Sequence, residues 1–142
     1  MTQQEFTAAL ARNRARAEDI AAALPTAPDE DMEALIRGFI SCKYFLATNE
    51  MDTDDLIRLG DRSTEKLADL QKGGLRYADK NAGCTTAGSS TIKKVLLAMA
   101  LGKAIGAKLN ADDVAYAETI PQLARLVVRV RAKSRPGAES GN

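Results

Sequence analysis

The sequence predicts an all-α protein that folds as a single helical bundle. Aromatic residues make up 4% of its 142 residues and tryptophan is absent, so leucine, isoleucine, valine, methionine and alanine must fill the interior. Such a core suits closely packed helices better than a β-sandwich. Apolar residues recur at helical spacing in several segments bounded by proline, glycine or capping residues, and no segment shows the strict alternation of a half-buried strand. A chain of this length favours one domain.

The first predicted helix covers about residues 3–24. Its apolar face would be formed by Phe6, Leu10, Ala17, Ile20 and Leu24. Pro25 and Pro28 then end the helix and form a short hinge, because proline cannot continue a helix interior. We therefore expect residues 1–28 to form an N-terminal helix and hinge that precede the main bundle at residues 29–132.

A second helix is predicted to begin at the acidic residues 29–31, whose charges favour the first turn of a helix. Its apolar stripe continues as far as Phe45 and Leu46. The helix should therefore end near Asn49.

A third helix should follow Met51, with Asp52 or Thr53 as its N-cap, and should stop at the glycine pair 73–74. The pattern leaves open whether Gly60 divides this helix in two. Residues 73–88 are small and polar, and they are interpreted as a loop of about fifteen residues, which is longer than the usual connection.

Residues 90–105 form the next predicted helix, which ends at Gly106. We expect its buried side to carry Ile92, Val95, Leu96, Met99 and Ala100. A single helical turn is predicted over residues 111–116, with Asn110 as its cap.

The last predicted helix is capped by Thr119 and accommodates Pro121 at an early helical position. Its apolar face would consist of Leu123, Leu126, Val127 and Val130. The basic residues at this end are interpreted as a solvated face; they are Arg125, Arg129, Arg131, Lys133 and Arg135. Residues 133–142 are predicted from their composition to be a disordered basic tail.

Composition excludes several classes of function. Histidine is absent, which removes histidine-based acid–base catalysis and any Cys/His zinc site. The net charge of +1 argues against a dedicated nucleic-acid-binding or membrane-binding protein. No apolar run is long enough to cross a membrane, and the N-terminal segment lacks the features of a signal peptide. We therefore expect a cytoplasmic protein with no metal site.

The two cysteines, Cys42 and Cys84, are interpreted as free thiols, since cytosolic proteins rarely contain disulfides. Cys42 should lie in or beside the core, and Cys84 should lie in the long loop. The glycine spacing of residues 83–90 is similar to that of a phosphate-binding loop. Ser89 stands where that motif requires lysine and no strand precedes it, so nucleotide binding is not predicted.

The stretch from Gly88 to Val130 resembles the second half of an acyl carrier protein. The similar pieces are, in order, Met99-Ala100-Leu101, Gly106-Ala107-Lys108-Leu109, Asp112-Asp113 and Glu118-Thr119-Ile120-Pro121-Gln122-Leu123. Acyl carrier proteins are small helical bundles in which a serine at the start of the second helix bears 4'-phosphopantetheine. The resemblance implies an acyl-carrier-protein-like core within residues 29–132, with an extra N-terminal helix before it.

By this resemblance the protein would carry an acyl or aminoacyl thioester and present it to partner enzymes. It would not be an enzyme itself and would have no catalytic residue. Those partners would be a phosphopantetheinyl transferase and acyl-transferring or condensing enzymes, as in fatty acid or polyketide biosynthesis. Ser90 is the first choice for the attachment site, and Ser63, Ser89 and Thr91 are the alternatives. Ser63 is included because Leu59-Gly60-Asp61-Arg62-Ser63 resembles the approach to the carrier serine. A helix N-terminus would stabilise the phosphodiester through its free N–H groups and its dipole.

The sequence departs from the carrier pattern at several positions. In the gap-free alignment Thr91 falls on the attachment position, and Ser90 reaches it only with a one-residue slip. The usual aspartate before the serine is missing, and Lys93 and Lys94 reverse the charge that carriers present to basic partners. Hydroxyl residues such as Ser89 are also ordinary N-caps. The alternative is therefore a helical protein–protein interaction module with a degenerate carrier fold and no prosthetic group.

Overall fold

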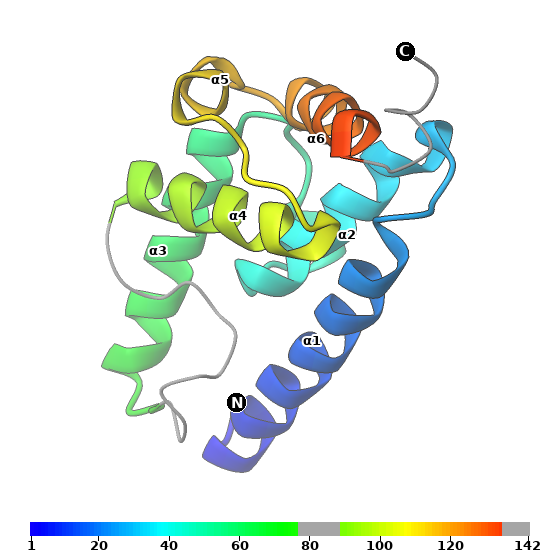
Figure 1. Cartoon of the computed structure of the whole chain (residues 1–142). Helices are drawn as coiled ribbons and strands as arrows, with labels where there is room; N and C mark the ends of the chain where they lie inside the picture. The colour runs from blue at the N-terminus through cyan, green and yellow to red at the C-terminus, as the bar shows by residue number, and fades with distance from the viewer. Residues whose placement is uncertain (77–88, 135–142) are drawn as a thin grey trace.

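The computed structural model describes residues 1–76 and 89–134, whose regular elements are all helices (Figure 1). The prediction of an all-α helical bundle is confirmed. The α-helices are α1 (Gln3–Ala23), α2 (Met32–Lys43), α3 (Leu56–Lys72), α4 (Ser90–Ile105), α5 (Ala111–Tyr116) and α6 (Ile120–Ser134), and the 3₁₀ turns are η1 (Asp29–Asp31) and η2 (Thr48–Glu50). Within the described ranges, β-type pairing is limited to one bridge between Asp55 and Thr119.

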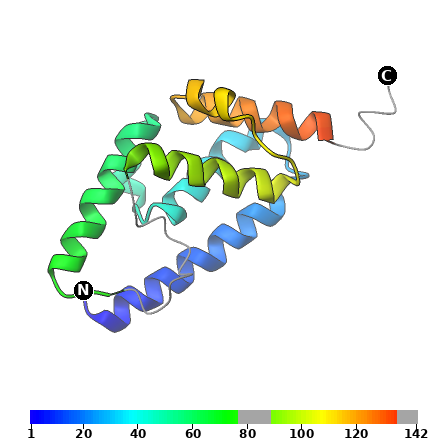
Figure 2. The same cartoon turned by 60° about the vertical axis from the view of Figure 1, so that its left-hand side comes forward.

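The helices pack mainly in pairs. α1 packs along α2, α3 packs along α4, and α6 lies against α2 (Figures 1 and 2). The main core contains buried residues from these helices, including Ile20, Ile36, Leu59, Leu101 and Leu123. A smaller apolar cluster joins the start of α1 to the end of α3; it consists of Phe6, Leu10, Phe45, Leu67 and Leu75. Because α1 contributes to both clusters, it is an integral helix of the bundle.

α2 ends earlier than the sequence predicts, at Lys43 instead of near Asn49. Phe45 adopts a left-handed backbone conformation with a φ of 55°, which cannot continue a right-handed helix. The turn is closed by the Ser41 hydroxyl, which donates to the Leu46 carbonyl at 2.6 Å. This turn lets Phe45 join the smaller cluster while Leu46 stays in the main core.

The N-cap of α3 is Asp55, not Asp52 or Thr53 as the sequence suggests. The Asp55 carboxylate accepts hydrogen bonds from two backbone N–H groups of the first turn, at 3.0 and 3.1 Å. Asp52 instead pairs with Arg62 at 2.5 Å, so its carboxylate is engaged elsewhere. The helix then continues unbroken through Gly60, which answers the question that the pattern left open.

The first turns of α3 and α6 are joined by backbone hydrogen bonds. The Leu56 N–H donates to the Glu118 carbonyl at 3.0 Å, and the Ile120 N–H donates to the Asp54 carbonyl at 2.9 Å. Thr119 caps α6 as predicted, since its hydroxyl accepts a hydrogen bond from a first-turn N–H at 3.4 Å. Two helices that are distant in the sequence therefore begin side by side.

Arg131 lies inside the molecule, although the sequence analysis placed it on a solvated face. It is 3% exposed, and its guanidinium donates to the carbonyls of Leu24 and Ala27 at 2.8 and 2.7 Å. The same group pairs with Asp29 at 2.5 Å. Arg131 therefore ties the last turn of α6 to the hinge between α1 and α2.

α6 also continues farther than expected, to Ser134. Lys133 and Ser134, the first residues of the predicted disordered tail, are therefore helical. The remainder of that predicted tail lies outside the described residues, as does most of the predicted loop at residues 73–88. At the start of that loop, α3 ends at Lys72 as the glycine pair predicts.

Candidate functional site

α4 turns an apolar stripe toward solvent, contrary to the prediction from sequence. We call this stripe the α4 outer face; it consists of Ile92, Val95, Leu96 and Met99. The exposed fractions of these side chains lie between 41% and 65%, although all were expected to be buried. Of the expected set, only Ala100 packs against the core. The buried apolar side of α4 is formed instead by Leu97, Ala98, Leu101 and Ile105.

The prediction failed because α4 is apolar on two sides, and apolar spacing alone does not choose between them. Close backbone approaches make the choice. A Cβ atom on Gly102 would lie 2.7 Å from the carbonyl oxygen of Ala107, and a Cβ atom on Gly60 would lie 2.8 Å from the Cβ of Ser90. Glycine is needed at both points. The last turns of α4 therefore lie against the connection to α5, and the first turn of α4 lies against α3.

Two lysines occupy the inner side of α4. Lys93 is completely buried, with its Nζ 6.0 Å from the centre of the Tyr44 ring. Lys94 is 7% exposed and donates to the Ala115 carbonyl at 3.2 Å. Burial lowers the pKa of Lys94, while two nearby carboxylates oppose this shift. Both side chains are buried, so the expectation that these lysines set the charge of a docking surface is wrong.

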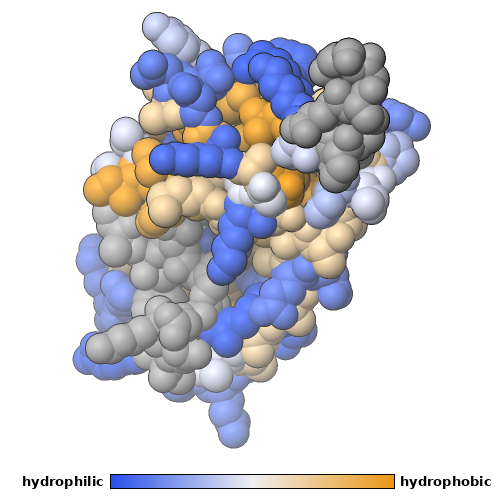
Figure 3. Space-filling model, in the orientation of Figure 1, coloured by the Kyte–Doolittle hydropathy of each residue, from blue (hydrophilic) through white to orange (hydrophobic). Residues whose placement is uncertain are grey.

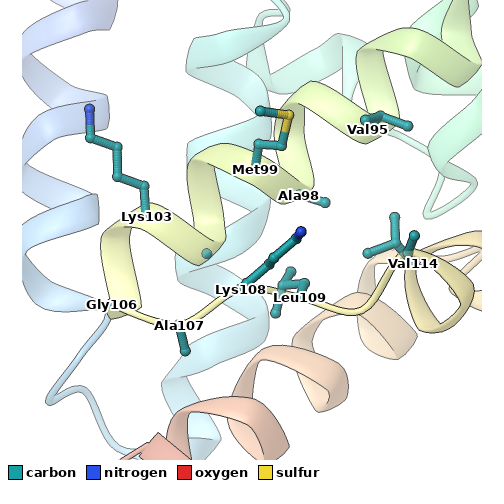
Figure 4. Close-up of a pocket in the computed structure, with 11 residues that line it drawn as sticks. Val95, Ala98, Met99, Lys103, Gly106, Ala107, Lys108, Leu109 and Val114 are labelled. Carbon is teal, nitrogen blue, oxygen red and sulfur yellow. The ribbon is translucent and has the colours of Figure 1, made fainter.

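A groove of about 640 Å³ lies between α4, the connection to α5 and α5 itself (Figure 4). Val95 and Met99 of the outer face line one side, and Leu109 and Val114 line the other. The Lys108 side chain reaches from the connection toward α4 (Figure 4). The volume falls within the range of small-molecule sites, and the walls are mostly apolar.

The connection that forms one wall of the groove begins at Gly106, whose φ of 73° ends α4 as the sequence predicts. The Ala107 N–H then donates to the Gly102 carbonyl at 3.0 Å, which holds the connection against the last turn of α4. Asn110 caps α5 as predicted, because its side-chain oxygen accepts hydrogen bonds from the backbone N–H groups of Asp112 and Asp113. The groove itself was not predicted from the sequence; the close spacing of the glycines at 102 and 106 was the available signal.

The candidate attachment residues differ in access to solvent. Ser89 is exposed and is the N-cap of α4, where its hydroxyl accepts a hydrogen bond from the Ile92 N–H at 3.4 Å. Ser90, the first choice from sequence, is partly buried because its Cβ faces Gly60. Thr91 is exposed. The start of α4 therefore offers accessible hydroxyl groups, and Ser89 is the more accessible of the two serines.

Ser63 is unsuitable for attachment in the folded protein, which corrects its place among the alternatives. It lies within α3, not at a helix start, and is 0% exposed. Its hydroxyl donates to the Tyr44 carbonyl at 2.7 Å. A modifying enzyme would have to unfold part of α3 to reach this oxygen, so the likeness of the preceding residues to a carrier motif has no counterpart in the geometry.

The remaining expectations concern cysteines, metals and membranes. Cys42 is a buried free thiol, as predicted, and burial raises its pKa. Cys84 and most of the phosphate-loop-like segment 83–90 lie outside the described residues. In residues 1–76 and 89–134, no group of three potential metal ligands comes together. No helix in those ranges combines the length and the apolar character needed to span a bilayer.

The site therefore combines accessible hydroxyls at the start of α4 with an apolar surface along the same helix, and Figure 3 shows hydrophobic residues at the surface on this side of the molecule. Comparisons of the chain with known protein families, with curated proteins and with solved structures found no match.

Proposed function

We propose that this protein is a carrier-like protein that bears a 4'-phosphopantetheine arm on a serine at the N-terminus of α4. It would present an acyl or aminoacyl thioester to partner enzymes and catalyse no reaction itself. The observation that supports this proposal is that one helix, α4, has an exposed serine at its start and an exposed apolar stripe along its length.

The N-terminus of α4 has the chemistry that a phosphodiester requires. The first N–H groups of a helix lack partners within the helix, and the dipole favours negative charge there. The Ser89 hydroxyl satisfies one of these groups only at 3.4 Å, which is a long hydrogen bond. Little stability is therefore lost when that oxygen is esterified. We place the arm on Ser89, with Ser90 second because Gly60 restricts it.

The α4 outer face lies where a tethered group would meet it. Ser89, Ile92, Leu96 and Met99 follow one another at intervals of three or four residues, which places them along one side of a helix. At about 1.5 Å per residue, Val95 lies only about 9 Å along the axis from Ser89. An acyl chain attached at the start of α4 would therefore reach the groove and be shielded there from water.

The partners of such a carrier would be a phosphopantetheinyl transferase and acyl-transferring or condensing enzymes, as in fatty acid or polyketide biosynthesis. These enzymes would approach from the side of α4, because the serine and the apolar stripe are both on it.

A second candidate function is a helical interaction module without a prosthetic group. The observation that favours it is the close packing of Ser90 against Gly60, together with an outer face that can bind a partner directly. In this case Ser89 acts only as an N-cap, a role that contributes about 1 kcal/mol.

The test is the intact mass of the protein after incubation with coenzyme A and a broad-specificity phosphopantetheinyl transferase, followed by peptide mapping. We expect one added phosphopantetheine in the folded protein, lost in Ser89→Ala and retained in Ser90→Ala. Loss in Ser90→Ala alone would move the site to Ser90.

Two controls make a negative result meaningful. A known carrier modified in the same reaction shows that the transferase is active, and circular dichroism shows that each variant is folded. No mass change in a folded sample with a working control would contradict the carrier function and favour the interaction module.

A further inference from the structure

The α4 outer face extends beyond the groove. Val95 and Met99 line the groove, whereas Ile92 and Leu96 do not, yet they are 51% and 41% exposed. From Ile92 to Met99 the stripe is about 10 Å long at the helical rise per residue. A small molecule in the groove would leave Ile92 and Leu96 of the α4 outer face uncovered. An elongated partner that follows α4 would cover the whole stripe.

Two cations stand at the C-terminal end of this stripe. Lys103, in the last turn of α4, and Lys108, in the connection to α5, are both exposed and both contribute to the groove. Neither forms an ion pair within the part of the chain that the structure describes. Among the described residues that line the groove, none is acidic. Other cations of the protein, such as Arg37 and Lys66, are paired with carboxylates.

From these observations we infer that the α4 outer face, together with Lys103 and Lys108, is a docking surface for an acidic amphipathic helix of a partner protein. The apolar side chains of that helix would cover the stripe and enter the groove, at the i, i+3, i+4 and i+7 spacing by which helices bind grooves. Its glutamates or aspartates would flank the apolar side chains and meet the two lysines.

The charge pattern selects this partner over two others. A basic helix would bring its cations against Lys103 and Lys108, and a second copy of this chain docked with the two α4 helices parallel would do the same with its own lysines. Like charges that meet at an interface oppose association. The inference does not depend on a prosthetic group; in a carrier, the partner helix and the acyl chain would occupy the groove in turn.

The experiment uses the full, unmodified chain and two designed peptides of about five helical turns. Both carry the same leucine face; one has glutamate and the other lysine at the flanking positions. Binding is measured by fluorescence anisotropy, and the contact surface is mapped by NMR chemical shifts. We expect the glutamate peptide to bind, to shift the resonances of α4 and the connection to α5, and to weaken as salt is added.

Charge-reversal variants test the electrostatic part. Lys108→Glu should lower the affinity for the glutamate peptide by up to about fivefold, which is the upper end for an exposed ion pair. Lys72→Glu makes the same charge change at the end of α3 and should leave the affinity unchanged. The double variant Lys103→Glu/Lys108→Glu should reverse the preference, so that the lysine peptide binds more tightly.

Met99→Gln tests the apolar part. Met99 is 65% exposed, so this variant should fold normally, as circular dichroism will show. We expect this variant to bind the glutamate peptide with an affinity about fivefold lower or more, as for a side chain at the centre of an interface.

Several results would overturn the inference. Equal or tighter binding of the lysine peptide, shifts that lie away from α4, or absence of binding by both peptides would each do so. Binding of dodecanoate in the groove without binding of either peptide would assign the groove to a small anionic amphiphile. Sedimentation that shows dimers through α4 would assign the face to a second copy. The mass-spectrometric test of Ser89 is unaffected by any of these outcomes, so the two proposals fail separately.

Discussion

α4 and α6 are helices of similar length, 16 and 15 residues, and the same kind of apolar spacing was found in both. In α6 the predicted stripe is the buried one, with Leu123, Leu126 and Val127 in the core. In α4 the predicted stripe is the exposed one. The difference is that α6 has the exposed arginines Arg125 and Arg129 opposite its apolar face, whereas α4 has a second apolar side.

The comparison shows what a helical pattern can and cannot establish. Where only one side is apolar, spacing identifies both the helix and its buried face. Where two sides are apolar, spacing identifies the helix alone, and contacts from distant residues decide which side is buried. The apolar side that remains outside is then a surface available for binding, as the α4 outer face illustrates.

Neighbouring leucines in α4 provide the most direct test of this comparison. Leu97 is 1% exposed and Leu96 is 41% exposed. Leu97→Ala should lower the free energy of unfolding by about 2–5 kcal/mol, because it removes a buried side chain and leaves a cavity. Leu96→Ala should cost no more than about 0.5 kcal/mol. Urea unfolding measures both, and similar losses in the two variants would mean that the orientation of α4 is wrong.

In α6 the corresponding test is Arg131→Met. This change leaves the buried carbonyl of Leu24 and the partly buried carbonyl of Ala27 without this donor. A buried unpaired acceptor costs about 1–3 kcal/mol, and a partly buried one costs less. The Asp29 side chain is 70% exposed and can be solvated again, so we expect a total loss of about 3 kcal/mol in the free energy of unfolding.

Arg129→Met is the matched control in the same helix. The Arg129 side chain is 57% exposed and its ion pair with Asp113 spans 3.6 Å, so its removal should change the free energy of unfolding by less than about 0.5 kcal/mol. Urea unfolding that ranks the two arginines in the opposite order would refute a structural role for Arg131.

A smaller effect is expected at the crossing of α3 and α4. Gly60→Ala would force its Cβ to within 2.8 Å of the Ser90 Cβ, and overpacking of this kind costs about 1–3 kcal/mol. Alanine regains about 1 kcal/mol of helix propensity. We expect a net loss of about 1 kcal/mol in urea unfolding, with NMR shift changes centred on Ser90. A stabilised protein would show that the two helices do not meet here.

The smallest effect concerns the pH dependence that Lys94 confers. Its pKa in the folded state lies below the ordinary value of 10.5. Between the two values the unfolded chain binds more protons than the folded one, so stability should rise with pH in this window. Lys94→Met should flatten that rise in urea unfolding measured as the pH approaches the ordinary pKa of 10.5 from below. Lys108→Met, which removes an exposed lysine, should preserve it.

Local signals predicted the starts of the later helices well. Asn110 and Thr119 cap α5 and α6 as expected, and Gly106 ends α4 through a left-handed conformation. These predictions succeeded because a cap or a glycine stop is a contact among residues a few positions apart.

Predictions that depended on distant residues failed. Asp52 or Thr53 was expected to cap α3, but the cap is Asp55 and Asp52 pairs with Arg62. Arg131 was expected in solvent, but its acceptors lie at the end of α1 and in the hinge. The candidate site followed the same rule. The start of α4 was found from its hydroxyl residues, whereas the groove needed knowledge of where α5 lies relative to α4.

The bridge between the first turns of α3 and α6 has a consequence for hydrogen exchange. The amide hydrogens of Leu56 and Ile120 are both bonded to carbonyls of the opposite segment, so separation of the two helix starts exposes both amides to solvent. The two amides then become exchangeable in the same opening, and we expect similar protection factors for them in hydrogen exchange. Leu56 and Ile120 are distant in the sequence, but they belong to the same local unit of opening.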